Sequence, residues 1–280
     1  MKKRSNYIRN YIRLILIVIV LVWTLFPFYC MLVTSLKMNK ELYDLSANPF
    51  LIKNFTLDHF KYLFQDTSFS IWYRNSLVVS FCSSLISVII SFLAGYSLSR
   101  LRFRGSSLWG LIIFVAYLVP PTILFIPLAQ IVSFLKVSNS LFALILTYPT
   151  FIVPFCTWMM MSYFSTIPFE LEESALIDGA SRIQILIKII LPLSLPAVIT
   201  VTLFSFTLSW GELIYALIFI SSSIIKTLPV GIRSELIRGD VFYWGPLMAA
   251  ALLASVPVIL VYSFLTKYYI SGLTKGSVKG

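Results

Sequence analysis

The sequence predicts an all-α polytopic membrane protein with six transmembrane helices, and two features lead to that class. The chain has 280 residues, of which 59% are hydrophobic and only 12% are charged, and its mean hydropathy is +0.91. These proportions are typical of a membrane protein and unlike those of a soluble domain. The second feature is that the apolar residues form long separate segments, each able to cross the hydrocarbon layer as a helix of about 20 residues.

Six segments meet this length requirement. They cover approximately residues 13–36, 72–98, 108–134, 141–164, 197–220 and 247–270. We expect residues 1–280 to form a single transmembrane domain, with a loop over 165–196 and a C-terminal tail over 271–280 outside the bilayer. The first segment is too long for the apolar region of a signal peptide and lacks a small-residue cleavage site after it, which favours an uncleaved anchor.

Prolines interrupt two of these segments. The third contains Pro120, Pro121 and Pro127, and the fourth contains Pro149 and Pro154. A proline inside a helix leaves a carbonyl unpaired, which is tolerated in lipid only where neighbouring groups or water satisfy it. The third and fourth spans are therefore candidates to line a pathway, although any single proline can also serve packing alone.

Basic residues predict the orientation of the chain, because cytoplasmic loops are enriched in lysine and arginine. The clusters precede the first span, follow the second, lie in the loop after the fourth and follow the sixth: Lys2, Lys3, Arg4, Arg9, Arg13; Arg100, Arg102, Arg104; Arg182, Lys188; Lys267, Lys275, Lys279. All fall on the same side of a six-span topology. We therefore expect both termini and the loop 165–196 to be cytoplasmic, and the net charge of +11 to reflect this bias rather than a nucleic-acid surface.

The stretch Glu170–Pro196, ELEESALIDGASRIQILIKIILPLSLP, stands out between the fourth and fifth spans. Its early glutamates suit the first turn of a helix, where carboxylates complement the helix dipole, and Asp178-Gly179 should end that helix. Ser181 and Gln184 have the spacing of a capping box, which predicts a second helix that ends at Pro192. From the physics alone, this helix–glycine–helix hairpin is equally compatible with an amphipathic connector lying on the lipid surface.

One string within this stretch resembles the EAA loop of the permease subunits of ABC importers. Residues 173–180 read E-S-A-L-I-D-G-A, against the family pattern E-A-A-x-x-D-G-A, and Pro192 follows downstream as in the family. Ser174 replaces the first alanine, a change between small residues. The resemblance implies a type I ABC importer permease fold, with a loop that docks on an ATPase subunit through Glu170, Glu173, Ser174, Ala175, Asp178, Gly179 and Ala180.

Further segments resemble the carbohydrate-uptake branch of these permeases, in particular the maltose-type second permease. Trp210-Gly211-Glu212 is similar to the W-N-E/D signature of the fifth span, with glycine in place of asparagine, and the tail Ser271–Gly280 is similar to the ending GLTAGAVKG. Charge within a span is costly and faces a cavity or partner, so Glu212, with its neighbours Trp210 and Tyr215, is a candidate for the translocation pathway. The alternative, that the Glu212 carboxylate only forms a hydrogen bond between helices that holds the bundle together, is slightly favoured. The resemblance of the tail implies a contact between Lys275, Gly276, Lys279 and the ATPase.

The resemblance also implies a location in the inner or plasma membrane of a prokaryote, and it implies the partners. These are a second homologous permease subunit, two cytoplasmic ATPase subunits, an extracytoplasmic solute-binding protein and membrane lipid, without nucleic acid. No G-x-x-x-x-G-K-S/T motif occurs in the chain, so ATP and Mg²⁺ are expected on the ATPase subunits. We expect no catalytic residues, no metal site and no cofactor in this chain.

The sequence leaves three functions open. The first is a permease subunit of a binding-protein-dependent ABC importer for a sugar or oligosaccharide. The second is a permease for another polar solute, such as a glycerophosphodiester, and the third is a membrane scaffold or sensor that does not transport. Aromatic residues are abundant in the spans, but they are ordinary at lipid interfaces as well, so they do not identify the solute.

Overall fold

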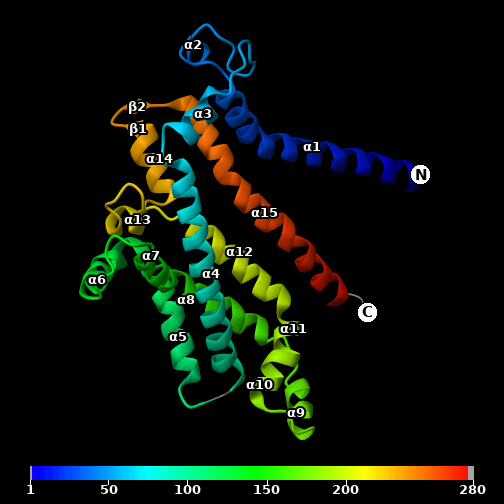
Figure 1. Ribbon diagram of the computed structural model, residues 1–280. Helices are drawn as coiled ribbons and strands as arrows, with labels where there is room; N and C mark the ends of the chain where they lie inside the picture. The colour runs from blue at the N-terminus through cyan, green and yellow to red at the C-terminus, as the bar shows by residue number, and fades with distance from the viewer. Residues whose placement is uncertain (1, 102, 277–280) are drawn as a thin grey trace. The chain divides into compact units, whose positions relative to one another are not determined.

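The computed structural model describes residues 2–101 and 103–276, and this part of the chain is predominantly helical (Figure 1). The longer helices are α1 (Lys2–Ser35), α3 (Asp58–Gln65), α4 (Phe69–Arg100), α5 (Ser106–Tyr117), α6 (Pro121–Phe134), α7 (Leu141–Thr147), α8 (Pro149–Phe164), α9 (Glu170–Ile177), α12 (Leu195–Trp210), α13 (Ile214–Phe219), α14 (Leu228–Leu236) and α15 (Trp244–Gly276). Shorter elements are α2 (Asn39–Leu42), α10 (Arg182–Ile185), the π-helix η1 (Leu186–Ile190) and α11 (Leu191–Leu193). Two short strands, β1 (Ile237–Arg238) and β2 (Val241–Phe242), pair antiparallel.

The chain divides into two compact units. The first contains residues 1–69 and 232–256, and the second contains residues 70–231 and 257–280. The two sites described in the next subsection both lie in the second unit.

A buried ion pair organises the first unit. The ammonium of Lys37 lies 3.7 Å from the Glu41 carboxylate, and both side chains are almost completely buried. Backbone N–H groups of Asn54 and Lys53 donate to that carboxylate and hold the pKa of Glu41 below its usual value, while desolvation opposes them. These contacts fold residues 37–55 into a fixed loop, because a buried charge must be paired or hydrogen-bonded to be tolerated.

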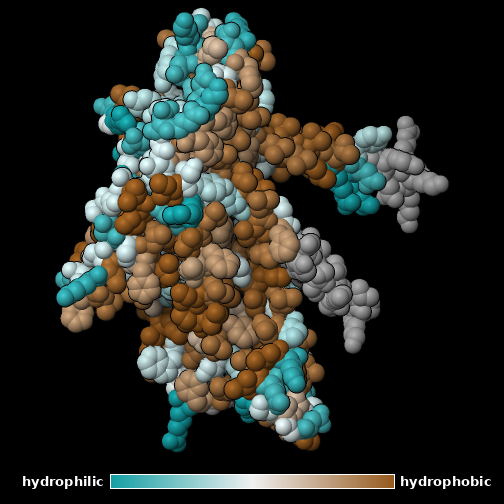
Figure 2. All heavy atoms as spheres, viewed as in Figure 1, coloured by the Kyte–Doolittle hydropathy of each residue, from teal (hydrophilic) through white to brown (hydrophobic). Residues whose placement is uncertain are grey.

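The second unit is built around α8. Residues four apart on one face of this helix, Ile152, Cys156, Met160 and Phe164, are each no more than 1% exposed. This spacing places their side chains in one stripe, and α5, α7 and α12 pack against α8. The described side chains on the flanks of the unit are largely apolar, whereas hydrophilic residues gather at the end formed by α9 and α10 (Figure 2). That distribution suits a body surrounded by lipid.

Four helices of the described chain are long and apolar enough to cross a membrane: 9–35, 69–100, 141–164 and 244–266. Two further pairs qualify if each bent pair is counted as one span, which gives up to six by length and composition. The segments predicted at 13–36, 72–98, 141–164 and 247–270 coincide with these four helices to within a few residues, except that α1 and α15 extend further at one end. The helix over 141–164 consists of α7 and α8, which meet at Tyr148.

The third predicted segment, 108–134, is not one continuous helix. It forms α5 and α6, which are bent by 100° relative to one another. Pro120 disfavours helical geometry in the residue before it, and Pro121 suits the first position of a new helix, where a missing N–H leaves no bond unmade. The adjacent prolines thus turn the expected kink into a break.

The fifth predicted segment, 197–220, is also interrupted. α12 ends at Trp210, residues 211–213 are not helical, and α13 begins at Ile214. In this region the helix over residues 182–193 is followed directly by α12, and the two are bent by 77° relative to one another. The second helix of the hairpin runs through the wider π-helical turns of η1 to Leu193, next to the predicted end at Pro192, and the chain turns at Ser194.

Candidate functional site

The hairpin predicted around Gly179 is present, and Gly179 forms its corner. Its φ is +82°, a left-handed conformation that costs other residues about 1–2 kcal/mol. The N–H of Gly179 donates to the carbonyl of Leu176 at 3.1 Å, and the N–H of Ala180 donates to Ala175 at 2.9 Å. This pair of bonds is a Schellman motif, which satisfies the last carbonyls of α9.

The second helix of the hairpin begins with the predicted capping box. The Ser181 hydroxyl accepts from the N–H of Gln184 at 3.3 Å, and the Gln184 side chain accepts from the N–H of Ser181 at 2.8 Å. Both bonds use donors that a helix start would otherwise leave unpaired. Two local signals, a glycine and a capping box, thus shape the hairpin.

A glycine is required at position 179 by the backbone conformation and not by lack of space for a side chain within this chain. A Cβ built on it would meet nothing within 4 Å. A glycine at this position can serve a backbone conformation that a side chain would penalise, or a close approach to another subunit. The positive φ establishes the first of these, and the open space leaves its outer side free for a contact.

The predicted loop residues divide between the two sides of the hairpin. Glu170, Glu173, Ser174, Asp178 and Gly179 are exposed, whereas Ala175 and Ala180 are half-buried against the core of the second unit. Two large apolar side chains near the tip, Ile177 and Ile183, are 86% and 69% exposed. The hairpin therefore presents a mixed acidic and apolar surface away from the bundle.

Sequence reasoning missed the residue that attaches this hairpin to the bundle. Glu172 is 3% exposed, and its carboxylate accepts from Nε of Arg100 at 2.5 Å and from the hydroxyl of Tyr96 at 2.9 Å. Arg182, on the second helix of the hairpin, lies 4.0 Å from the same carboxylate. Glu172 thus joins both helices of the hairpin to the end of α4.

Arg100 also holds the end of α8. Its guanidinium donates to the carbonyls of Phe164, Ile167 and Pro168 at 3.2, 2.8 and 3.2 Å. It lies 3.7 Å from the centre of the Phe169 ring, within the range of a cation–π contact. The planar, five-donor guanidinium suits this multiple role, which a lysine would not reproduce.

The sequence held little sign of this pair. Glu172 shares a helix face with the half-buried Ala175, three residues further on, which marks it as facing inward. Arg100, however, is 72 residues away, in a basic turn that topology already explains. No local spacing links the two.

A second candidate site lies beside the break between α5 and α6 and the break between α12 and α13. It is a cavity of about 400 Å³, lined by Ala116, Tyr117, Val119, Pro120, Pro121, Leu124, Phe151, Phe204, Leu208, Glu212, Ile214 and Tyr215. Four of these residues are aromatic and one is a carboxylate. Such a lining, mostly apolar with a few placed polar groups, is typical of a small-molecule site.

Glu212 has a structural role in this cavity. Its carboxylate accepts from the N–H groups of Tyr215 and Ala216 at 2.8 and 3.2 Å and thereby caps the start of α13. The Tyr215 hydroxyl donates to the carbonyl of Pro121 at 3.0 Å, next to the break between α5 and α6. The two breaks are therefore tied together across the cavity.

Trp210 does not line this cavity. It is 7% exposed. Its ring stacks on Phe206 and meets the Tyr73 ring edge-on, with the ring centres 5.6 Å apart. The structure thus brings together Glu212 and Tyr215 but separates Trp210 from them. α12 ends at Trp210 and α13 begins at Ile214, so the break between the two helices turns Glu212 and Tyr215 away from the direction of Trp210.

Comparison with known proteins identifies the family. Residues 87–275 match the family described as "Binding-protein-dependent transport system inner membrane component". The chain belongs to this family. These proteins are the permease components of ABC importers, membrane subunits that are not themselves catalytic.

Individual relatives cover nearly the whole permease. It is 39% identical to the Inner membrane ABC transporter permease protein YcjP of Escherichia coli, over 93% of each chain. It is 32% identical to the Trehalose/maltose transport system permease protein MalG of Thermococcus litoralis, over 99% of each chain. A chain of a solved bacterial ABC transporter that imports the acidic polysaccharide alginate matches with a TM-score of 0.81 at 22% identity, covering 95% of this chain and 98% of that one.

These comparisons confirm the predicted permease family and its all-α, polytopic importer fold. The predicted tail contacts remain untested, because α15 ends with Lys275 and Gly276, whose side chains are not described, and Lys279 lies outside the described residues. Among the described residues no group of three histidine, cysteine or acidic side chains could hold a metal ion.

We expect Gly179→Leu to weaken the hairpin without preventing insertion of the permease. The side chain finds open space, so the penalty is the left-handed backbone, about 1–2 kcal/mol. Association with the ATPase, measured by co-purification, should fall together with solute-stimulated ATP hydrolysis. Gly239→Leu is the matched control, because Gly239 also has a positive φ, +61°, and open space around its Cβ, but lies in the β1–β2 turn. Normal hydrolysis and association in Gly179→Leu would contradict a coupling role.

Proposed function

We propose that this permease carries a sugar or oligosaccharide across the cytoplasmic membrane, driven by ATP hydrolysis on separate subunits. The observation that supports this most directly is its end-to-end similarity to permeases named for saccharides, including the trehalose/maltose permease. Further relatives are named for diacetylchitobiose and maltodextrin, at 32% and 36% identity. On these relatives we place a saccharide ahead of the alternative solute, a glycerophosphodiester.

We propose the cavity around Glu212 and Tyr215 as a place where the saccharide touches this subunit. Sugar rings present C–H faces that pack on aromatic rings, and Tyr117, Phe151, Phe204 and Tyr215 supply such rings. A sugar hydroxyl can donate to the free lone pairs of the Glu212 carboxylate. Trp210, which packs away from this cavity, is no longer included in the proposed pathway.

The exposed side of the hairpin is the proposed dock for an ATPase subunit. Its apolar residues Ile177 and Ile183 would be buried in a complex, and the neighbouring Glu173 and Asp178 would meet basic residues. The remaining proposed partners are a second permease, a second ATPase subunit and an extracytoplasmic solute-binding protein. A structural neighbour of 17% identity is an alginate transporter in complex with a saccharide-bound periplasmic protein.

Reconstitution tests this function. The permease would be co-expressed with its partner permease, ATPase and binding protein, purified as a complex and placed in proteoliposomes containing ATP and Mg²⁺. We expect ATP-dependent uptake of at least one of a panel of radiolabelled saccharides, beginning with trehalose and maltose, and dependence on the binding protein. Uptake of glycerophosphodiesters but of no saccharide would overturn the proposed solute class.

Cysteine labelling tests the proposed orientation. In a variant without Cys30, Cys82 and Cys156, single cysteines at Ser46, Lys136 and Ser222 should react with an impermeant maleimide from outside the cell. A cysteine at Ser106 should react only after the membrane is opened, because it follows the basic turn after the second span. Labelling of Ser106 from outside intact cells would reverse the proposed topology.

Glu212→Gln separates the structural role of this carboxylate from a contact with solute. Glutamine keeps one acceptor oxygen but places an amide against an N–H donor, so we expect a modest loss of stability, about 1 kcal/mol, and normal assembly. If the carboxylate also contacts solute, uptake should fall severalfold with a raised KM. Uptake with an unchanged KM would remove Glu212 from the proposed pathway and leave it as a helix cap.

A further inference from the structure

The first unit contains a cavity of about 620 Å³ whose walls come from α2, α3 and the residues at the start of α15. We call it the tyrosine cavity, because Tyr43, Tyr62 and Tyr243 are three of the residues that line it. Its volume falls within the usual range of small-molecule sites, about 300–1,000 Å³. It shares no residue with the hairpin or with the cavity around Glu212, so neither of those sites accounts for it.

Contacts within the first unit hold the walls of this cavity in place. His59 is 4% exposed, and its Nε2 donates to the carbonyl of Lys37 at 2.7 Å. Gly245, in the first turn of α15, packs against the imidazole so closely that a Cβ on it would overlap the ring. The Tyr43 hydroxyl donates to the carbonyl of Phe242 at 3.2 Å. The cavity is therefore formed before a ligand arrives, which lowers the cost of binding.

The three tyrosine rings give the cavity apolar surfaces with polar edges. Tyr43 is exposed, and Tyr62 and Tyr243 are half-buried. A tyrosine presents an apolar ring face together with a hydroxyl that both donates and accepts. A saccharide has the same two kinds of surface, because its C–H groups form flat faces and its hydroxyls form the rim. The rings therefore match a saccharide better than they match a purely apolar or a purely ionic ligand.

Three exposed side chains of the lining, Asn39, Lys40 and Asp58, supply hydrogen-bonding groups beside the rings. The carboxylate accepts, the ammonium donates and the amide does both. Asp58 pairs with Lys61 at 3.7 Å, but both side chains are largely exposed, and such surface pairs are weak. Within the described part of the chain, no contact occupies the side chains of Asn39 and Lys40. One positive and one negative group suit an uncharged ligand that is rich in hydroxyls.

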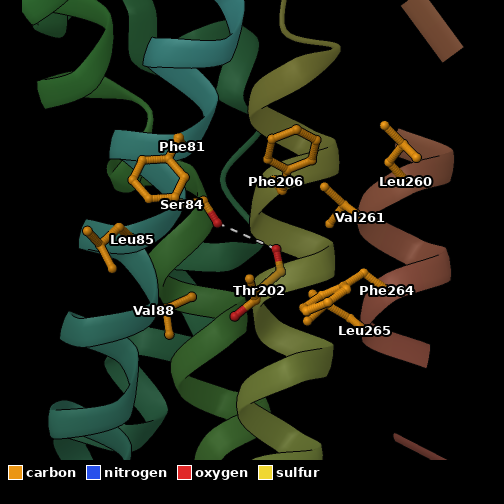
Figure 3. A pocket seen from close by; sticks show the side chains of 10 residues that line it. All are labelled: Phe81, Ser84, Leu85, Val88, Thr202, Phe206, Leu260, Val261, Phe264 and Leu265. Atoms are coloured by element: carbon orange, nitrogen blue, oxygen red, sulfur yellow. Dashed lines mark hydrogen bonds between the residues drawn. The ribbon is translucent and has the colours of Figure 1, made fainter. Parts of the chain in front are cut away.

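A groove in the second unit has a lining of the opposite kind. It measures about 400 Å³ and lies between α4, α12 and α15 (Figure 3). Eight of its ten lining residues are apolar, and the other two are Ser84 and Thr202. The Ser84 hydroxyl donates to the carbonyl of Thr202 at 3.4 Å, and the Thr202 hydroxyl donates to that of Val198 at 2.8 Å. Sugar hydroxyls would lose their hydrogen bonds to water there without replacement.

We propose that the tyrosine cavity is a saccharide site on the outer side of the membrane. The rings of Tyr62 and Tyr243 pack on the C–H face of a sugar, and the Asp58 carboxylate accepts a hydrogen bond from one of its hydroxyls. The cavity is formed by segments that follow α1 and precede the sixth span, which are extracytoplasmic in the proposed orientation. The inference rests on the proposed function in that the ligand is a saccharide.

Photolabelling of the reconstituted complex tests this site. The complex is prepared without the binding protein and without ATP, so that a sugar reaches the permease directly. It is illuminated with maltose or trehalose that carries a diazirine, and labelled peptides are identified by mass spectrometry. We expect label within residues 38–62 or 243–246. An excess of the same unlabelled sugar should remove this label, whereas glycerophosphocholine should not.

Two variants of α3 and two matched controls locate the site. Asp58→Asn and Tyr62→Ala should each reduce the label at least fivefold. Asp66→Asn and Phe64→Ala should leave it unchanged, because these residues are also exposed and lie on α3 or directly after it but do not line the cavity. Asp58 is exposed, so Asp58→Asn should still co-purify with the partner permease, and its loss of label would not reflect misfolding.

The outcomes separate this site from the proposed function. Equal label in all four variants, or label confined to residues outside the tyrosine cavity, would overturn the site. Import of a saccharide by a complex that takes no label in this cavity would also overturn it and would leave the proposed function intact. A complex that imports no saccharide would overturn the proposed function, while competed label in the cavity of that complex would still support the site.

Discussion

Replacing Glu172 by glutamine should destabilise the permease far more than the same replacement at Glu173. The two glutamates are adjacent in sequence, but Glu172 is 3% exposed and paired with Arg100, whereas Glu173 faces solvent. Removing one partner of a buried ion pair leaves the other charge uncompensated and costs about 3 kcal/mol or more. The midpoint temperature of detergent-purified protein, followed by size-exclusion fluorescence, should drop in Glu172→Gln and stay near its original value in Glu173→Gln.

The same pair of variants distinguishes anchoring from docking. Glu173→Gln changes the exposed face of the hairpin, so it should act on ATPase affinity and leave thermal stability nearly unchanged. Glu172→Gln should release the hairpin from α4 and lower stability before any partner is added. Equal midpoint temperatures for the two variants would contradict an anchoring role for Glu172.

Gly95→Ala is expected to be the second strongly destabilising change, although it adds a single methyl group. Gly95 lies on α4 where it crosses α8, and a Cβ there would lie 2.7 Å from the Cβ of Met160 and 3.3 Å from the backbone N of Met161. Neither atom can move without shifting α8. Overpacking of this kind costs about 1–3 kcal/mol, which should again appear as a lowered midpoint temperature.

Gly110→Ala is the matched control for this prediction. A Cβ at Gly110 would come within 2.9 Å of the Met161 side chain, but the atom approached is the terminal Cε. Methionine has three rotatable side-chain bonds and adapts readily to a changed neighbour. The midpoint temperature should therefore change little in Gly110→Ala. A loss equal to that of Gly95→Ala would indicate that α5 and α8 are as rigidly packed as α4 and α8.

The sequence by itself determined those features that depend on residues close together in the chain, namely the spans and the hairpin. The length of apolar runs predicted the spans, because crossing a bilayer requires about 20 apolar residues whatever they pack against. The hairpin was predictable for the same reason: Gly179 and the Ser181–Gln184 box act on backbone groups within a few residues, and the structure has both in place. The string 173–180 then identified the family before any contact was known.

The third and fifth predicted spans show features that residues close together in the chain determined only in part. The adjacent Pro120 and Pro121 predicted an interruption, but neither the 100° bend nor the packing of α6 against α13 could be read from the prolines. No proline lies at the break after Trp210, so the sequence did not predict it. Glu212 stabilises that break by capping α13, and this role requires a backbone already turned away from the helical path.

Only the tertiary structure decided which charged and polar groups meet. Arg100 and Glu172 are 72 residues apart, and the Asn75 amide donates to the carbonyl of Ile224, 149 residues further along the chain. Such pairs leave no spacing in the sequence, because their proximity is set by how whole helices pack and not by the chain between them. The tertiary structure also assigned Trp210 to the packed interior and Tyr215 to the cavity, since the break at 211–213 sets the direction of each side chain.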